Sequence, residues 1–195
     1  GNMRVFCRIR PILQKELGRP SIDIEYKGRN SLIIKGVEKI SNVGRNGTQR
    51  DIDQFQFNRI FKENNTQKEV FEEVSPLIQS SLNGIIINIF AYGQTGSGKT
   101  YTMECDMSNE EKYGIIPRAV NKIFNDYTDE LKSMGWQLKL YLSVCEIYNK
   151  KTRDLINEKN VEKTEELKDV EINNIEEWKK NFSQVAQRRK VAETK

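Results

Sequence analysis

The stretch Ile85–Thr100 constrains the fold of this chain most strongly, because an apolar run leads there into a glycine-rich loop. Residues 93–100 read Gly-Gln-Thr-Gly-Ser-Gly-Lys-Thr and match the pattern G-x-x-x-x-G-K-[ST] at every fixed position. The β-branched run Ile85–Ala91 before the loop is typical of a buried strand. The sequence therefore predicts an α/β fold built around a phosphate-binding loop.

Each residue type in this loop has a separate chemical reason. Glycines let the backbone wrap closely, with its N–H groups aimed at phosphate oxygens. We expect Lys99 to place its ammonium against the β- and γ-phosphates, and Thr100 to offer its hydroxyl to Mg²⁺. The helix expected next would point its positive end at the same anion. The competing interpretation is a chance glycine turn, which average residue frequencies produce in roughly one chain of this length in 100.

Composition argues against several other classes of protein. The 195 residues include 32 Lys and Arg against 28 Asp and Glu, and a net charge of +4 is too small to indicate a nucleic-acid-binding protein. Histidine is absent, which removes the commonest general base and argues against a hydrolase triad. The longest apolar run falls far short of the ~18 residues of a membrane span, so we expect no membrane insertion. The three cysteines lack metal-ligand spacing and favour a reducing, intracellular compartment.

Before the loop, the first predicted strand covers residues 3–9 and is ended by Pro11. Arg8 and Arg10 are two residues apart, so on a strand both side chains project from the same face. Spacing alone leaves two alternatives open for them, contact with an anion or sugar and a plain salt-bridged strand.

Further strands are expected at Ser31–Lys35 and Phe55–Phe61, with hairpins and loops over the rest of residues 12–50. Thr66 and Glu69 form a capping box for a helix that should bend at Pro76 and end at Gly84.

After the loop, residues 105–112 are expected to form an exposed loop, and a second helix with Pro117 in its first turn should run to Gly135. A long strand is predicted at Trp136–Cys145. The highly charged residues 157–173 indicate a mobile surface loop. Asn174 and Glu177 are expected to cap a last helix that buries Trp178, Phe182 and Val185.

Taken together, these stretches resemble the N-terminal part of a kinesin motor domain. The resemblance implies an α/β fold of the P-loop NTPase type, with a central, mostly parallel β-sheet flanked by helices, of which residues 1–195 would be a part. It also implies coupling of MgATP hydrolysis to movement on, or binding of, microtubules. The matching motifs, in the family's order, are Arg4–Pro11, Phe57–Phe61, Phe90–Met103, Gly114–Arg118, Glu146–Asn149 and Arg153–Leu155.

The resemblance also implies a role for individual residues. Arg8, Arg10 and Pro11 would line the base and ribose, with Tyr101 close to the adenine side. Thr100 would be the residue on Mg²⁺, and no catalytic residue is expected within residues 1–195. The residues expected to hold ATP or ADP through their phosphates are Gly93, Gln94, Thr95, Gly96, Ser97, Gly98, Lys99 and Thr100.

The start of the chain, Gly1–Val5, is similar to the junction of neck and motor in the C-terminal-motor, minus-end-directed kinesins. That similarity implies a neck coiled coil before Gly1, a dimer, microtubules as partner, and a location on the cytoplasmic microtubule cytoskeleton, including the spindle.

Several positions depart from the family pattern. Ile85 and Ile86 stand where the family usually has Tyr-Asn, so the aromatic ring that would stack on adenine is missing. Lys150 replaces a commonly acidic residue, and residues 157–173 form a shorter segment than in the family. The family's two switch regions and main microtubule-binding helix lie beyond Lys195, so we expect residues 1–195 alone not to hydrolyse ATP at a motor's rate.

The leading hypothesis is therefore the ATP-binding part of a microtubule motor ATPase. One alternative is a non-catalytic kinesin-like head that binds microtubules or a partner motor. A further alternative is an unrelated P-loop NTPase.

Overall fold

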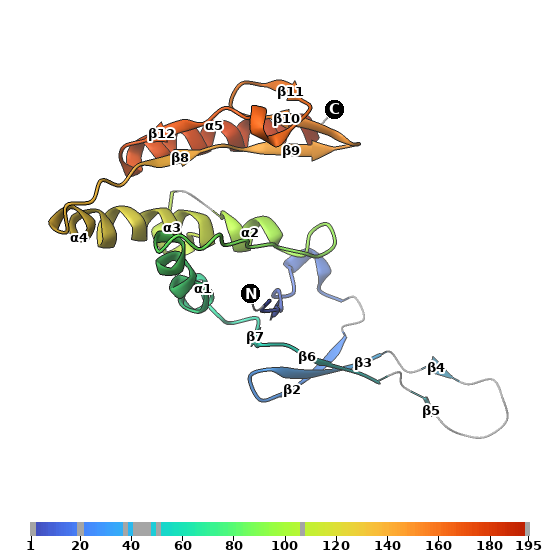
Figure 1. Ribbon diagram of the computed structural model, residues 1–195. Helices are drawn as coiled ribbons and strands as arrows, with labels where there is room; N and C mark the ends of the chain where they lie inside the picture. The colour runs from blue at the N-terminus through green and yellow to red at the C-terminus, as the bar shows by residue number, and fades with distance from the viewer. Residues whose placement is uncertain are drawn as a thin grey trace. The chain divides into compact units, whose positions relative to one another are not determined.

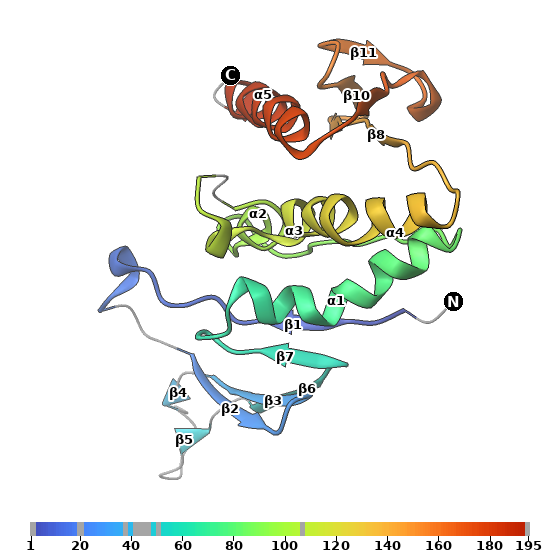
Figure 2. The same cartoon turned by 90° about the vertical axis from the view of Figure 1, so that its left-hand side faces the viewer.

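The computed structural model describes residues 3–18, 22–36, 39–40, 48–49, 52–105 and 108–193. The chain divides into two compact units, whose elements are labelled in Figures 1 and 2. The first unit is Gly1–Val70 with Gly93–Gly98, and the second is Phe71–Tyr92 with Lys99–Lys195. No helix in the described part of the chain is long and apolar enough to cross a membrane.

The first unit contains a parallel strand pair and two antiparallel sheets, one of three strands and one of two. Strand β1 lies parallel to β7, with Cys7 opposite Ile60 (Figure 2). Strand β3 lies between β2 and β6 and is antiparallel to both. Ile60 and Phe61 are buried, and the Phe6 ring meets Phe61 edge-on. The elements of this unit are β1 (Phe6–Arg8), a 3₁₀ helix (Gln14–Glu16), β2 (Asp23–Lys27), β3 (Ser31–Lys35), the pair β4 (Lys39–Ile40) and β5 (Thr48–Gln49), β6 (Ile52–Gln56) and β7 (Arg59–Phe61).

The strand predicted at Ser31–Lys35 is confirmed as β3, whereas the one predicted at Phe55–Phe61 is divided between β6 and β7. The break falls at Asn58, whose Oδ1 accepts a hydrogen bond from Val5 N–H at 2.8 Å. Asn58 N–H donates in turn to the Val5 carbonyl at 2.9 Å. Asn58 is therefore hydrogen-bonded to the residue before β1, at the point where the chain passes from β6 to β7.

Helix α1 (Gln67–Leu82) begins and ends as its sequence predicts. Thr66 N–H donates to Glu69 Oε2 at 2.6 Å, and Glu69 N–H donates back to Thr66 Oγ1 at 3.2 Å, which confirms the capping box. At the other end Gly84 has φ +87°, and Ile85 N–H donates to the Ser80 carbonyl at 3.1 Å. This Schellman arrangement satisfies carbonyls at the end of the helix.

The second unit places helices beside a small β structure (Figure 1). Its core joins Val120 of α3, Ile172 of β12, and Trp178 and Phe182 of α5. The burial predicted for Trp178, Phe182 and Val185 is confirmed. The remaining elements are α2 (Lys99–Met103), a 3₁₀ helix (Glu110–Lys112), α3 (Ile115–Lys122), a π-helix (Ile123–Tyr127), α4 (Thr128–Ser133), β8 (Leu140–Leu142), β9 (Cys145–Tyr148), β10 (Lys151–Asp154), β11 (Lys159–Val161), a 3₁₀ helix (Thr164–Glu166), β12 (Val170–Ile172) and α5 (Ile175–Glu193).

The helical run before Gly135 and the cap of the last helix are also confirmed. Pro117 lies in the first turn of α3, and Gly135 has φ +80°. Glu177 N–H donates to Asn174 Oδ1 at 2.9 Å at the start of α5. The strand predicted at Trp136–Cys145 is much shorter: only β8 forms before Cys145, and the Trp136 side chain is 68% exposed.

The α/β class is confirmed, but the described strands do not join into one central sheet. They form separate ladders of two or three strands, and of the described pairs only β1–β7 is parallel. The run Ile85–Ala91, predicted as a buried strand, forms no strand and has no paired neighbour among the described strands. Ile86 and Phe90 are 88% and 87% exposed. A strand depends on neighbours for its backbone hydrogen bonds, and no described segment pairs with this run.

The prediction of a mobile loop at residues 157–173 is wrong. The segment contains β11 and β12, and Ile172 is only 2% exposed. β11 pairs with β10, and β12 pairs with β8. The charged residues of this segment are exposed, while Val170 and Ile172 pack in the core.

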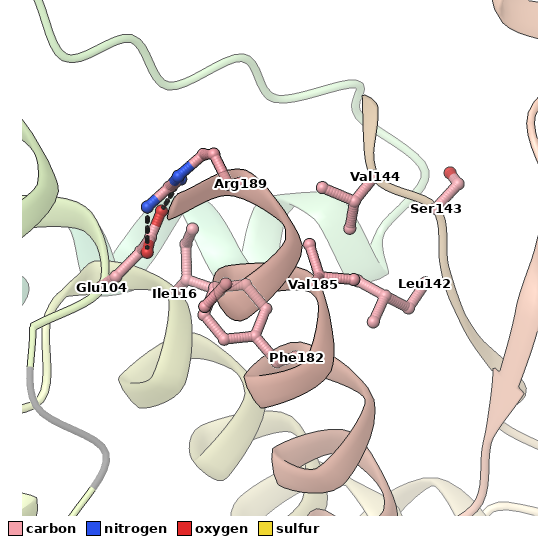
Figure 3. A pocket seen from close by; sticks show the side chains of 9 residues that line it. Glu104, Ile116, Leu142, Ser143, Val144, Phe182, Val185 and Arg189 are labelled. Atoms are coloured by element: carbon pink, nitrogen blue, oxygen red, sulfur yellow. Dashed lines mark hydrogen bonds and ion pairs between the residues drawn. The ribbon is translucent and has the colours of Figure 1, made fainter. Parts of the chain in front are cut away.

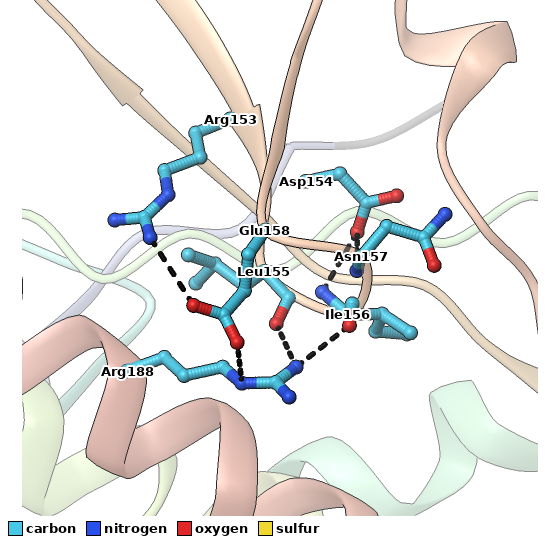
Figure 4. A network of polar contacts seen from close by, with 7 residues as sticks. All are labelled: Arg153, Asp154, Leu155, Ile156, Asn157, Glu158 and Arg188. Atoms are coloured by element: carbon cyan, nitrogen blue, oxygen red, sulfur yellow. Dashed lines mark hydrogen bonds and ion pairs between the residues drawn. The ribbon is translucent and has the colours of Figure 1, made fainter.

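Asp154, only 1% exposed, organises this region through backbone hydrogen bonds (Figure 4). Its Oδ1 accepts from Ile156 N–H at 2.7 Å and from Asn157 N–H at 3.2 Å, and its Oδ2 accepts from Lys168 N–H at 2.8 Å. Burial alone would raise the pKa of Asp154, but these three amides and nearby Arg188 outweigh it and lower the pKa below its usual value.

Arg188 of α5 holds the same turn from the other side (Figure 4). Its Nη1 donates to the carbonyls of Leu155 and Ile156 at 2.8 and 2.7 Å, and its Nε lies 2.9 Å from Glu158 Oε1. The turn after β10 is therefore fixed both to α5 and to the segment before β12.

We predict that Asp154→Asn lowers the free energy of unfolding by about 1–3 kcal/mol, because an amide NH₂ would face one of the backbone donors now bound by a carboxylate oxygen. Since folding lowers this pKa, the carboxylate stabilises the fold above its unfolded pKa near 3.8, and that stabilisation is lost as the pH falls through the lower folded value. Urea unfolding at pH 7 and at decreasing pH measures the difference. The exposed Asp169→Asn is the control, and an equal effect of both variants would contradict this role.

We further predict that Lys150→Gly stabilises the β9–β10 hairpin by about 1 kcal/mol. Tyr148 pairs with Lys151, so Asn149 and Lys150 form a two-residue turn, with φ of +48° and +62°. A β-carbon is strained at such a φ, and glycine removes the strain. Lys150→Ala is the matched control because it removes the charge and keeps the β-carbon. Thermal unfolding in which both variants shift the midpoint equally would show that charge, rather than backbone strain, is responsible.

Candidate nucleotide-binding site

The loop Gly93–Gly98 has a backbone conformation that favours glycine at three positions. Gly93 has φ +155°, and a β-carbon built there would lie 2.5 Å from Ser97 Oγ. Ser97 N–H donates to the Gln94 carbonyl at 3.1 Å, which closes the turn. Gly96 and Gly98 also have positive φ values, of +80° and +98°. The loop is thus a tight turn whose residues 94–96 are exposed, and this geometry fits a bound phosphate.

Lys99 and Thr100 follow the loop directly as the first two residues of α2, in the second unit. The helix predicted to start here is confirmed, although it is only five residues long. The Thr100 carbonyl accepts from Glu104 N–H at 2.8 Å and from Cys105 N–H at 3.1 Å. Tyr101 lies on the same helix, with its side chain 49% exposed.

A hollow of about 300 Å³ adjoins the loop within the first unit. One wall is the loop itself, and the other is the segment that follows β1. A cation, an ion pair and an apolar side chain are all present in this lining. The lining residues are Arg10, Leu13, Lys15, Glu16, Gln94, Thr95 and Gly96.

Arg10 lies in this hollow and is paired with Glu16. Its Nη1 and Nη2 lie 2.8 and 2.9 Å from the two carboxylate oxygens, a bidentate arrangement. Glu16 also accepts from Leu13 N–H at 2.9 Å. The Arg10 hydrogen bonds first, and then the Leu13 amide, lower the pKa of Glu16 to about 2. Arg10 therefore forms a salt bridge in the chain alone, and its contact with an anion or sugar stays a prediction.

Arg8 and Pro11 lie near Arg10 in the chain but make different contacts. Arg8 Nη1 donates to Gln67 Oε1 at 2.7 Å, and Gln67 is 4% exposed at the start of α1. Pro11 is exposed, and its carbonyl accepts from Arg10 Nη1 at 3.0 Å. The structure therefore gathers Arg10 and Gly93–Gly98 in the first unit and directs Arg8 toward α1.

Glu16, Leu13 and Lys15 line the hollow but were not predicted from the sequence as site residues. The available signal was weak: Glu16 is an acidic residue shortly after Arg10, and it lies three residues after Leu13, the spacing of a capping box. Only the fold shows that Glu16 pairs with Arg10.

A second hollow, of about 220 Å³, lies within the second unit and has a different chemistry (Figure 3). Its walls are mostly apolar, from Ile116, Leu142, Phe182 and neighbouring side chains. At its edge Arg189 pairs with Glu104 at 2.6 and 2.9 Å. None of the phosphate-site residues predicted from sequence lines it. Within the described residues, no three His, Cys, Asp or Glu side chains gather as a metal site.

Comparison with known proteins shows the family of this chain. Residues 8–195 match the family model described as Kinesin motor domain. The chain is 43% identical over 159 residues to "Carboxy-terminal kinesin 2" of Xenopus laevis, covering 80% of this chain and 24% of that protein. It is 40% identical over 157 residues to "Kinesin-like protein KIN-14D" of Arabidopsis thaliana, covering 80% and 19%. It is also 40% identical over 172 residues to "Protein claret segregational" of Drosophila melanogaster, covering 88% and 22%. The chain thus spans about a fifth to a quarter of the length of these relatives.

Proposed function

This chain belongs to the kinesin motor-domain family, and from that premise we propose that its residues 93–100 bind MgATP or MgADP in a microtubule motor ATPase. The observation that carries the proposal is the backbone of Gly93–Gly98, a closed turn in which Gly93, Gly96 and Gly98 all have positive φ values that residues with a side chain rarely adopt. Family membership excludes the alternative of an unrelated P-loop NTPase.

The proposed roles follow from the chemistry of each group. Loop amides and the Lys99 ammonium bind the phosphate oxygens, and the Thr100 hydroxyl contributes to holding Mg²⁺. MgATP, when bound, supplies the transferable phosphoryl group and the charge of the metal ion. We assign Arg8, Arg10, Pro11 and Tyr101 to the base and ribose side.

Kinesin motor domains are ATPases in general, and we propose microtubule-stimulated hydrolysis for the whole protein. Microtubules would be its partner, and a neck coiled coil before Gly1 would join two heads on the microtubule cytoskeleton. A phosphate loop mostly grips the ground state, whereas turnover also needs groups that stabilise the transition state. We therefore propose that residues 1–195 alone turn over ATP far more slowly than the whole protein.

A non-catalytic head that binds microtubules or a partner motor is the second candidate. Ile85 favours it, because this aliphatic side chain cannot supply the aromatic stack on adenine. Single-turnover phosphate release by the whole protein distinguishes the two functions: a burst of phosphate supports a motor, and nucleotide binding without release supports a non-catalytic head.

We predict that Lys99→Ala weakens MgADP binding by about 10- to 100-fold, since a charge-assisted hydrogen bond is worth about 1.5–3 kcal/mol. Equilibrium titration with a fluorescent nucleotide measures the affinity. Lys132→Ala removes an exposed lysine of α4 and serves as the control. Equal affinity of the Lys99 and Lys132 variants would refute the phosphate site.

We also predict that Ile85→Tyr tightens ATP binding and raises the ratio of ATP to GTP affinity. A base stacked on an aromatic side chain gains about 1–3 kcal/mol, and this chain lacks that ring. Ile86→Tyr adds the same ring at the next position, which is also exposed, and is the control. If Ile85→Tyr leaves the ratio unchanged, position 85 does not contact the base.

A further inference from the structure

The Arg10–Glu16 pair leaves little of the Arg10 charge available to a phosphate. Both terminal nitrogens of the guanidinium are bound to the carboxylate, and Nη1 also donates to the Pro11 carbonyl. A fork of this kind fixes the plane of the guanidinium as well as its position. Arg10 therefore presents a flat, charge-compensated group rather than a bare cation.

Glu16 is itself held independently of Arg10. It ends the 3₁₀ helix Gln14–Glu16, in which its N–H donates to the Leu13 carbonyl at 2.8 Å. Its Oε2 accepts in return from Leu13 N–H at 2.9 Å. The carboxylate is thus anchored to the backbone before it meets the guanidinium.

The aliphatic part of the Arg10 side chain lies next to the loop Gly93–Gly98. A β-carbon built on Gly98 would lie 3.9 Å from Arg10 Cδ, an ordinary van der Waals distance. Arg10 and Glu16 both line the hollow beside Gln94, Thr95 and Gly96. The pair is one wall of a space whose other wall is the loop.

We propose that Glu16 is a positioning residue for the nucleotide: it holds Arg10 as a flat wall of the hollow, so that Arg10 contacts base and ribose instead of gripping phosphate. This inference rests on the nucleotide site proposed above. The Arg10–Glu16 pair has no net charge, so it attracts an uncharged base more readily than a charged phosphate. Guanidinium planes also stack well on aromatic rings. Lys15 is a second cationic residue in the lining of the hollow, in addition to Arg10.

The test compares two ligands in the full chain, MgADP and inorganic tripolyphosphate, which lacks base and ribose. Glu16→Gln removes the ionic fork and frees Arg10 to move. We expect it to weaken MgADP binding about two- to fivefold, the worth of an exposed guanidinium stack, and not to weaken tripolyphosphate binding. Glu25→Gln is the matched control, because Glu25 is paired with Lys27 and Lys35 on the β2–β3 ladder and does not line the hollow.

A double-mutant cycle tests whether Glu16 acts through Arg10. In an Arg10→Gln background, Glu16→Gln should cause no further loss of MgADP affinity. Glu16→Asp keeps the charge but is one methylene shorter, so it should show a smaller loss for MgADP alone. This variant supplies the test if Glu16→Gln does not fold, as judged by its thermal unfolding.

Four results would overturn the inference: equal weakening of both ligands, tighter MgADP binding, no change in MgADP binding, or additive losses in the cycle. Equal weakening would mean that Glu16 only maintains the loop, and tighter binding would mean that it competes with phosphate for Arg10. Lys99→Ala separates this inference from the proposed function. If that variant loses both ligands while Glu16→Gln behaves as wild type, only the inference fails; if it binds both normally, the proposed function fails.

Discussion

The positive-φ backbone of Gly93, Gly96 and Gly98 is the constraint on which the rest of the site depends. A β-carbon at position 93 would lie 2.5 Å from Ser97 Oγ, so the Ser97 side chain would have to rotate, and the φ of +155° would strain the backbone. The loop lies beside Arg10, whose Cδ is 3.9 Å from the position that a β-carbon on Gly98 would occupy. Glu16 then holds the guanidinium from the far side. The glycine-dependent backbone of the loop thus shapes one wall of the hollow, and the Arg10–Glu16 ion pair forms the other.

Sequence predicted the features whose causes are local. The capping box of Thr66 and Glu69 and the cap at Asn174 both depend on hydrogen bonds between residues three apart, so the pattern contains both partners. The G-x-x-x-x-G-K-[ST] pattern likewise specifies its own turn and the helix that begins at Lys99. In these cases the residues that determine the structure are also the residues that form it.

Predictions from the sequence were wrong or incomplete where the structure of a segment depends on residues far from it in the chain. The run Ile85–Ala91 has the composition of a buried strand, yet a strand requires neighbours, which composition does not report. Residues 157–173 were predicted to be mobile because they are highly charged. They are ordered by the hydrogen bond from Lys168 N–H to Asp154 and by the burial of Ile172. Glu16 was missed for the same reason, because its importance comes from a bidentate contact with Arg10 that exists only in the folded chain.

The central claim is that the Gly93–Gly98 backbone, followed by Lys99 and Thr100, binds the nucleotide phosphates. Amide hydrogen exchange of the full chain with and without saturating MgADP tests it most directly, because the claim concerns backbone N–H groups. If these groups bind the phosphates, amide exchange at residues 94–100 will slow on addition of MgADP, and exchange in the β9–β10 hairpin will not change. Saturating MgADP binding with no slowing at residues 94–100 would contradict it.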